Sequence, residues 1–162
     1  MAAYSFTTRW RLDAPIERVF DAIHDSLAWP SWWDAVIEVR EIEPGQADGT
    51  GNVRRYAMRG RLPYALTFDA RVTRVEPPVT LEGTATGELE GTGDWTLREV
   101  DGWTEVRYDW NIRTTRTFMN LAAPLPFVRR IFELNHDAVM RSGLRGITRL
   151  LGCRGMSVRS TR

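Results

Sequence analysis

The chain has 162 residues, of which 43% are hydrophobic and 27% charged, with a formal net charge of +1 and one cysteine. This length and composition predict a single domain over residues 1–162, and the lone cysteine excludes an internal disulfide. All 22 basic residues are arginine, which excludes catalysis by a lysine nucleophile or Schiff base. The first predicted element is a strand, because residues 4–12 alternate apolar and polar side chains.

A helix and a group of tryptophans follow this strand. Asp13 is a suitable N-cap, Pro15 suits a first helical turn and an apolar stripe follows, so residues 14 to about 26 are predicted to be a helix. The next segment is Trp29-Pro30-Ser31-Trp32-Trp33, where proline excludes a regular helix. We expect a short bent element whose rings mainly close one end of the core, with Trp33 reaching inward.

The middle of the chain reads as consecutive strands joined by turn residues. The predicted strands are residues 36–43, 52–60, 63–75, 79–89, 93–100 and 103–114. Asp101-Gly102 is the strongest hairpin sequence, because this pair suits a type I′ turn, and Glu90-Gly91 is read as another turn. Short connections without helices indicate antiparallel pairing.

The last third predicts one long helix, because no proline follows Pro126. About 25 helical residues would be roughly 38 Å long, enough to cross a sheet. Successive 100° steps place a mostly apolar set on one face. This set is Val128, Ile131, Phe132, Asn135, Ala138, Val139 and Ser142.

The C-terminal end, about residues 152–162, is a basic tail. No acidic residue follows Asp137. The arginines after Asp137 are Arg141, Arg145, Arg149, Arg154, Arg159 and Arg162. Such a tail could bind nucleic acid or anionic lipid, but cations near a helix C-terminus are also favoured by the helix dipole. We favour the second interpretation and expect no nucleic-acid partner. No apolar run approaches the roughly 20 residues that span a bilayer, and no signal-peptide pattern is present, so a cytoplasmic location is expected.

This order of elements predicts an α+β fold with a seven-stranded antiparallel sheet wrapped around the C-terminal helix and two short helices after the first strand. Three segments and the C-terminal helix carry a family resemblance: residues 14–23, the run from Trp29 to Trp33, and Gly91-Thr92-Gly93-Asp94-Trp95. They resemble the helix-grip fold of the START-like, birch-pollen-allergen-like superfamily, and within it the polyketide cyclase/dehydrase and lipid-transport (SRPBCC) family. The resemblance implies a cavity between sheet and helix for a small hydrophobic molecule that is polyketide-, lipid- or isoprenoid-like.

Strand parity and the helix face predict which side chains contact a ligand in that cavity. The expected ligand-binding residues are Trp33, Tyr56, Met58, Phe68, Trp95, Tyr108, Trp110, Phe132, Asn135 and Val139. Small residues in the 79–89 strand would make room for a flat apolar molecule. The alternative is that all these side chains simply fill the core.

Four polar residues are candidates for catalysis. Arg54 could stabilise an enolate or bind a carboxylate, Tyr56 and Tyr108 could donate protons, and His136 could act as a general base. Each also has a structural interpretation, with Arg54 reaching solvent, the tyrosine rings packed and His136 at the edge of its helix. Asn135 could orient a ligand or be satisfied by the sheet or a water molecule.

Other chemistries are disfavoured by the residues present. Two histidines, one cysteine and no His-Glu-x-x-His pattern predict no metal site, and no Gly-x-Ser-x-Gly elbow is present. The glycines lie between strands, which excludes a nucleotide loop, and we expect no cofactor. The leading hypothesis is a binding protein for a small hydrophobic ligand, and the enzyme alternative is a polyketide cyclase or dehydratase. A third hypothesis is an interaction module that uses the arginine-rich end, and pairing as a homodimer stays open.

Overall fold

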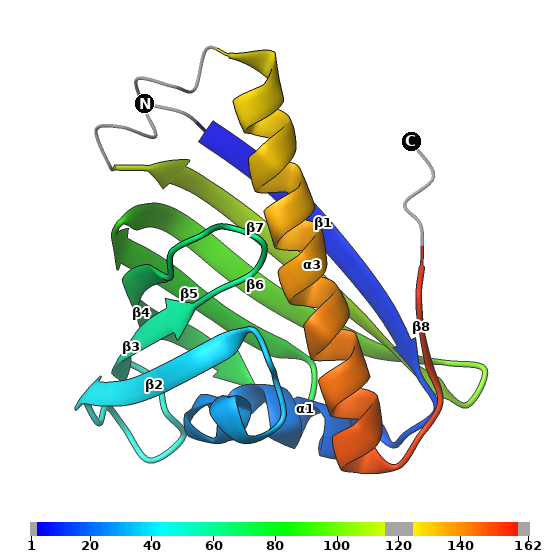
Figure 1. The fold of residues 1–162 in the computed structure, drawn as a ribbon. Coiled ribbons are helices and arrows are strands. Elements are labelled where there is room, and N and C mark those ends of the chain that lie inside the picture. Colours follow the sequence, from blue (N-terminus) through cyan, green and yellow to red (C-terminus); the bar gives the residue numbers. More distant parts are fainter. Residues whose placement is uncertain (1–2, 116–124, 159–162) are drawn as a thin grey trace.

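A strongly curved antiparallel sheet and one long helix make up most of the molecule (Figure 1). The computed structural model describes residues 3–115 and 125–158. Along the chain the elements are β1 (Ala3–Leu12), α1 (Ile16–His24), the 3-10 helix η1 (Ser26–Ser31), β2 (Val36–Glu43), β3 (Val53–Met58), β4 (Leu66–Glu76), β5 (Thr80–Gly87), β6 (Leu89–Val100), β7 (Trp103–Thr114), α3 (Pro126–Leu151) and β8 (Gly155–Ser157). The predicted helix-grip arrangement is confirmed.

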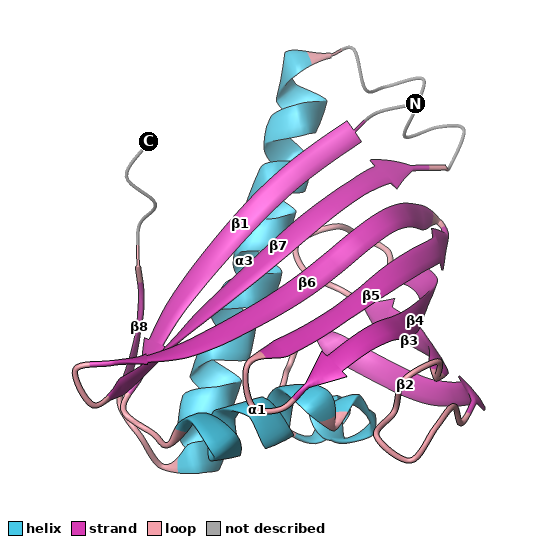
Figure 2. Cartoon of the chain, turned by 180° about the vertical axis from the view of Figure 1, so that it is seen from behind, coloured by secondary structure: helices cyan, strands magenta, loops and turns pink. Residues whose placement is uncertain are grey.

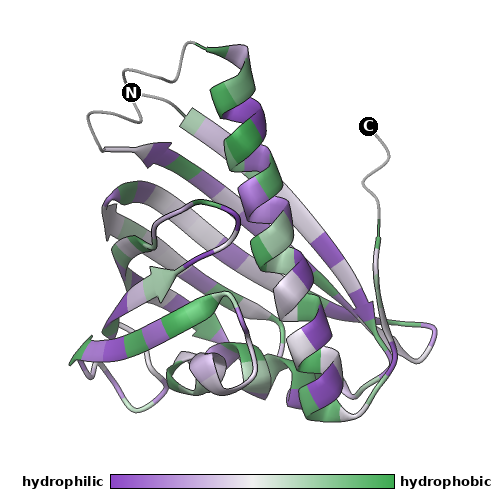
Figure 3. Cartoon of the chain, viewed as in Figure 1, coloured by the Kyte–Doolittle hydropathy of each residue, from purple (hydrophilic) through white to green (hydrophobic). Residues whose placement is uncertain are grey.

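The sheet has the order β2-β3-β4-β5-β6-β7-β1-β8. Seen from behind, its outer face is uncovered and α3 lies across its inner side (Figure 2). Apolar and polar residues alternate along the strands and around α3 (Figure 3), as expected for elements with one buried face. None of the helices within residues 3–115 and 125–158 is long and apolar enough to cross a membrane.

The strand count is one higher than predicted, because β8 adds an eighth strand beside β1. This strand has only three residues, and its pairing places Ser157 opposite Trp10. A segment this short carries no readable alternation, so the sequence predicts only a basic tail there. The arginines of the tail beyond residue 158 lie outside the described residues.

The start of β6 also differs from the prediction, because it begins at Leu89 and not at Gly93. Glu90-Gly91 is not a turn: Gly91 pairs with Ile112 inside the sheet. Gly91 has a φ of 150°, and a Cβ there would overlap the carbonyl oxygen of Asn111. Glycine is therefore needed at this position because two strands approach each other closely. The sequence-based prediction of a turn at Gly91 was wrong.

Helix α1 begins later than predicted and without the expected cap. Pro15 has an extended ψ of 140°, so the helix starts at Ile16 and no side chain caps it. Asp13 instead forms an ion pair with Arg154, with 2.8 Å between Oδ2 and Nη2. The apolar stripe of α1 is buried as predicted, through Ile16, Val19, Phe20 and Ile23.

The tryptophan run forms η1 and the turn after it, and it supports the C-terminal half of α3. Trp33 is 2% exposed, and its Nε1 donates to the carbonyl oxygen of Val139 at 2.9 Å. A Cβ at Gly143 would lie 2.7 Å from the Trp33 ring, and one at Gly146 would overlap the Trp32 carbonyl oxygen. The helix can approach this closely only because two glycines lie at the contact.

Most of the predicted inward face of α3 is confirmed, because Phe132, Asn135 and Ser142 are buried and Val128 and Val139 pack against the core. Ile131, predicted to face the core, is 44% exposed, whereas Met140, Gly143, Gly146 and Ile147 are buried. Glycine has no side chain and counts as neither apolar nor polar in a helical pattern. The pattern therefore does not identify Gly143 and Gly146 as part of the buried face. The helix ends at Gly152, which adopts a left-handed conformation with a φ of 62°.

Replacing Gly146 with alanine should destabilise the protein, although alanine is the better helix former. The added methyl group would be forced against the Trp32 backbone, and overpacking of this kind costs about 2 kcal/mol in the free energy of unfolding. Urea unfolding of Gly146→Ala measures this loss. Arg145→Ala, an exposed change on the same turn, is the control and should stay within roughly 0.5 kcal/mol of the wild type. Equal stability of the two variants would contradict the close packing.

Candidate ligand-binding cavity

A cavity of about 150 Å³ lies between the inner face of the sheet and α3. Every side chain that the sequence predicts as a ligand contact lines it: Trp33, Tyr56, Met58, Phe68, Trp95, Tyr108, Trp110, Phe132, Asn135 and Val139. The alternative of a completely filled core is therefore wrong. Contact of these residues with a ligand stays a prediction.

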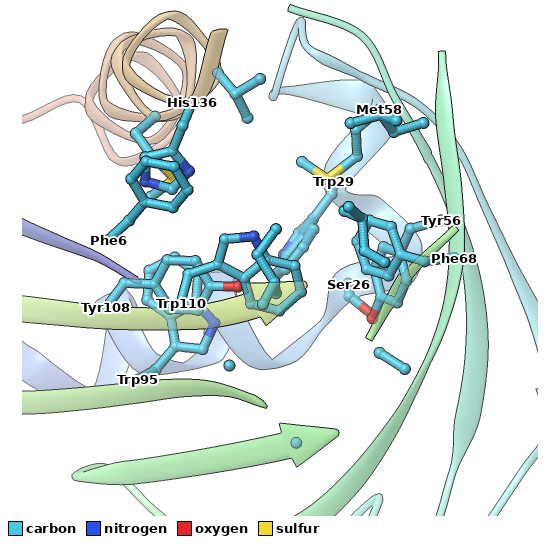
Figure 4. A pocket seen from close by; sticks show the side chains of 18 of the residues that line it. Phe6, Ser26, Trp29, Tyr56, Met58, Phe68, Trp95, Tyr108, Trp110 and His136 are labelled. Atoms are coloured by element: carbon cyan, nitrogen blue, oxygen red, sulfur yellow. The ribbon is translucent and has the colours of Figure 1, made fainter. Parts of the chain in front are cut away.

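Stacked aromatic rings form the wall that the sheet contributes (Figure 4). The ring of Tyr108 lies between two others, with centroids 4.0 Å from Trp95 and 5.9 Å from Trp110. A second stack joins Tyr56 and Phe68 at 5.5 Å. Such a wall presents flat apolar surfaces, which suits a flat apolar ligand.

Glycine makes room for the rings where the sheet passes beneath them. Gly83 of β5 pairs with Gly93 of β6, and both line the cavity. A Cβ at Gly93 would lie 2.8 Å from the ring of Trp110 and 2.9 Å from the hydroxyl oxygen of Tyr108. In the predicted 79–89 strand, Gly83 lines the cavity, but a Cβ there would meet the Arg71 carbonyl oxygen at 3.0 Å and not the rings.

A polar group of three residues lies at one side of the cavity. The hydroxyl of Ser26 accepts hydrogen bonds from Arg54 Nη1 and from the Tyr56 hydroxyl, both at 2.8 Å. The side chain of Arg54 is only 14% exposed, so it does not reach freely into solvent. Burial raises the pKa of Tyr56, although the Ser26 hydrogen bond and the Arg54 charge act in the opposite direction. Tyr56 is therefore a neutral donor near pH 7.

Tyr108 also reaches the cavity as a neutral group. Burial raises the pKa of its hydroxyl, and the nearby Tyr56 and Asp94 add to this rise. The hydroxyl can therefore donate a hydrogen bond to a ligand, but it is a weak acid for general acid catalysis.

His136 lies on the opposite side of the cavity from Ser26 and Tyr56 (Figure 4). Its ring stacks on Phe6 with centroids 4.1 Å apart, and Nε2 lies 3.3 Å from the Thr8 hydroxyl. Burial lowers the pKa of His136 to about 4. The imidazole is therefore neutral at pH 7 and is a weaker base than an ordinary histidine.

Asn135 is occupied by the backbone of the loop after β3. Its Oδ1 accepts hydrogen bonds from the backbone N–H groups of Arg61, at 2.7 Å, and Leu62, at 3.1 Å. The sequence left open whether a ligand, the sheet or a water molecule satisfies this side chain. The amide oxygen is satisfied by the backbone of a loop and not by the sheet. Asn135 fastens that loop to α3 and so helps to close the cavity.

Sequence reasoning missed several lining residues. Tyr4 and Phe6 share the inward parity of β1 and could have been found from that alternation. His24, Ser26 and Trp29 line the cavity from the end of α1 and from η1. A short 3-10 segment has no period from which an inward side can be read, so these residues carry no comparable pattern.

The fold and cavity define a START-like helix-grip protein, and the sequence agrees with this class. The profile of the polyketide cyclase / dehydrase and lipid transport family matches residues 3–152, so the chain belongs to this family. No curated protein matches the chain.

Several solved structures share the fold. The di-domain ARO/CYC BexL from the BE-7585A biosynthetic pathway is 22% identical with a TM-score of 0.65, over 86% of this chain and 48% of BexL. The chain thus spans about half of that protein. The Zhui aromatase/cyclase from Streptomyces sp. R1128 is 16% identical with a TM-score of 0.64, over 93% of each chain. A START superfamily protein from Mycobacterium smegmatis is 12% identical with a TM-score of 0.70, over 91% of this chain and 98% of that one.

The buried histidine predicts a specific pH dependence of stability. The pKa of His136 in the folded protein, about 4, is below its ordinary value of 6.5, so the unfolded chain binds the proton more readily. Stability is therefore lost as the pH falls from about 6.5 to about 4, by up to about 3 kcal/mol. His136→Phe keeps the ring stack on Phe6 without the titration and should lack this part of the loss. Urea unfolding of both proteins at pH 7 and pH 4 measures it, and equal losses would contradict the assignment.

Proposed function

We propose that the protein binds a small, flat hydrophobic molecule, polyketide-, lipid- or isoprenoid-like, between the sheet and α3. The observation that carries this proposal is the cavity itself, with stacked rings on one wall and few polar groups. Family membership and the aromatase/cyclase neighbours support a hydrophobic ligand-binding or cyclase role. Binding such a ligand requires no catalytic residue.

The size of the cavity favours a ligand with one aromatic ring inside it. A cavity of about 150 Å³ is the size that holds a benzene molecule in a protein core. Sites for drug-sized ligands are larger, about 300–1,000 Å³. A longer polyketide or isoprenoid would have to extend beyond this space or displace side chains.

The alternative function is a polyketide cyclase or dehydratase that acts on such a ligand. Arg54 favours it, because a guanidinium beside an apolar cavity can stabilise an enolate. The titrating groups favour binding instead: His136 has a low pKa, and those of Tyr56 and Tyr108 are raised. General acid-base catalysis works best with a group whose pKa lies near the working pH.

The binding proposal predicts that Trp110 contributes to affinity. Trp110→Ala removes part of the aromatic wall and should weaken binding of phenol, a neutral probe with one aromatic ring, by roughly fivefold. Isothermal titration calorimetry measures the dissociation constant. Trp103→Ala is the matched control, because Trp103 lies on the same strand but outside the cavity, beside Arg11 and Arg154. An equal loss in both variants, or no phenol binding by the wild type, would contradict the proposal.

Turnover separates the two functions. Mass spectrometry of molecules that copurify with the protein identifies a natural ligand, and incubation with an aromatic polyketide mimic tests for conversion. We expect the mimic to be returned unaltered. A cyclised or dehydrated product that disappears in Arg54→Gln would support the enzyme instead.

The arginine-rich end is partly used inside the fold, since Arg154 pairs with Asp13 and β8 pairs with β1. This supports the structural interpretation of the tail over nucleic-acid or lipid binding. A cytoplasmic location and a homodimer stay predictions from sequence.

A further inference from the structure

Arg54 has hydrogen-bond donors that the described residues do not use. Its Nε is buried and has no partner, whereas Nη1 donates to Ser26. Within the described residues, Arg54 forms an ion pair with Glu41, with 3.6 Å between Arg54 Nη2 and Glu41 Oε1. That distance is longer than a hydrogen bond, so the pair leaves much of the guanidinium unsatisfied.

The cost of this arrangement points to a missing acceptor. A guanidinium is charged at every physiological pH, and a buried charge without close partners is unfavourable. Glu41 lies opposite Arg54 on β2 and is 39% exposed, so water screens its attraction. The countercharge inside the protein is therefore incomplete.

The neighbouring groups are also donors. Ser26 accepts two hydrogen bonds through its hydroxyl oxygen, which leaves its own proton free to be donated. Tyr108 lines the same cavity, and its hydroxyl is a further group that can donate a hydrogen bond. An anionic oxygen group on the ligand can accept hydrogen bonds from these donors. A ligand group that only donates hydrogen bonds cannot.

We infer that the ligand carries a carboxylate, which binds Arg54 and Ser26 while its apolar ring packs against the aromatic wall. This inference rests on the proposed binding function and adds the class of ligand, a small aromatic or short apolar carboxylic acid. Arg54 lines the same cavity as Phe68 and Trp110, so one molecule can contact both the charge and the rings. Charge-assisted hydrogen bonds to arginine are the strong kind, and a carboxylate can accept two in parallel.

A matched pair of probes tests the inference. Cinnamate and cinnamamide have the same ring and chain, but only cinnamate is charged at pH 7. We expect the wild type to bind cinnamate with a dissociation constant roughly tenfold or more below that of cinnamamide, as measured by calorimetry. In Arg54→Gln this ratio should fall to about one, with the affinity for cinnamamide unchanged.

Two further variants keep the test decisive if Arg54→Gln does not fold. Glu41→Gln removes the competing carboxylate from the outer side of Arg54 and should increase the preference for cinnamate. Ser26→Ala removes one donor and should reduce that preference in part. Thermal unfolding of each variant identifies those that fold.

The binding results separate the carboxylate assignment from the proposed hydrophobic binding. Equal binding of the two probes by the wild type, or an unchanged preference in the folded variants, would overturn the carboxylate assignment but leave hydrophobic binding intact. If neither probe binds, the carboxylate assignment and the proposed function both fail.

Discussion

The docking of α3 on the tryptophan run is the contact on which the cavity depends. Trp33 donates to the Val139 carbonyl oxygen, and Gly143 and Gly146 let the helix backbone come close to this segment. The helix is thereby held at its C-terminal half, while Phe127 and Ile131 near its start stay exposed. A long helix held in this way spans the curved sheet without filling it, and aromatic side chains line the remaining space.

The chemistry of the cavity follows from its low polarity. Burial keeps His136, Tyr56 and Tyr108 neutral near pH 7, because a charged form would lose its hydration. Arg54 is the exception, since a guanidinium does not lose its proton, and it depends on Ser26 and a distant Glu41. The permanent charge of Arg54 thus lies in the same cavity as the stacked rings.

Much of the fold was predictable because its patterns are local. Strand alternation identified β2 and β7 with their observed bounds, and parity placed Phe68, Trp95 and Trp110 on the cavity wall. The errors share one cause, which is that glycine and short segments carry little periodic information. Gly91 was read as a turn, Ile131 was placed on the buried face of α3 whereas Gly143 and Gly146 were not, and β8 was not recognised.

The sequence by itself determined the element order, the inward parity of the strands and the family, because these depend on neighbouring residues and on motifs along the chain. Only the tertiary structure decided how the polar groups are satisfied. Arg54 meets Ser26 across 28 positions, and Asn135 meets the Arg61 backbone across 74. Such pairs form only when the sheet curves around α3. No local pattern therefore indicates that the Asn135 Oδ1 has two backbone partners while the Arg54 Nε has none.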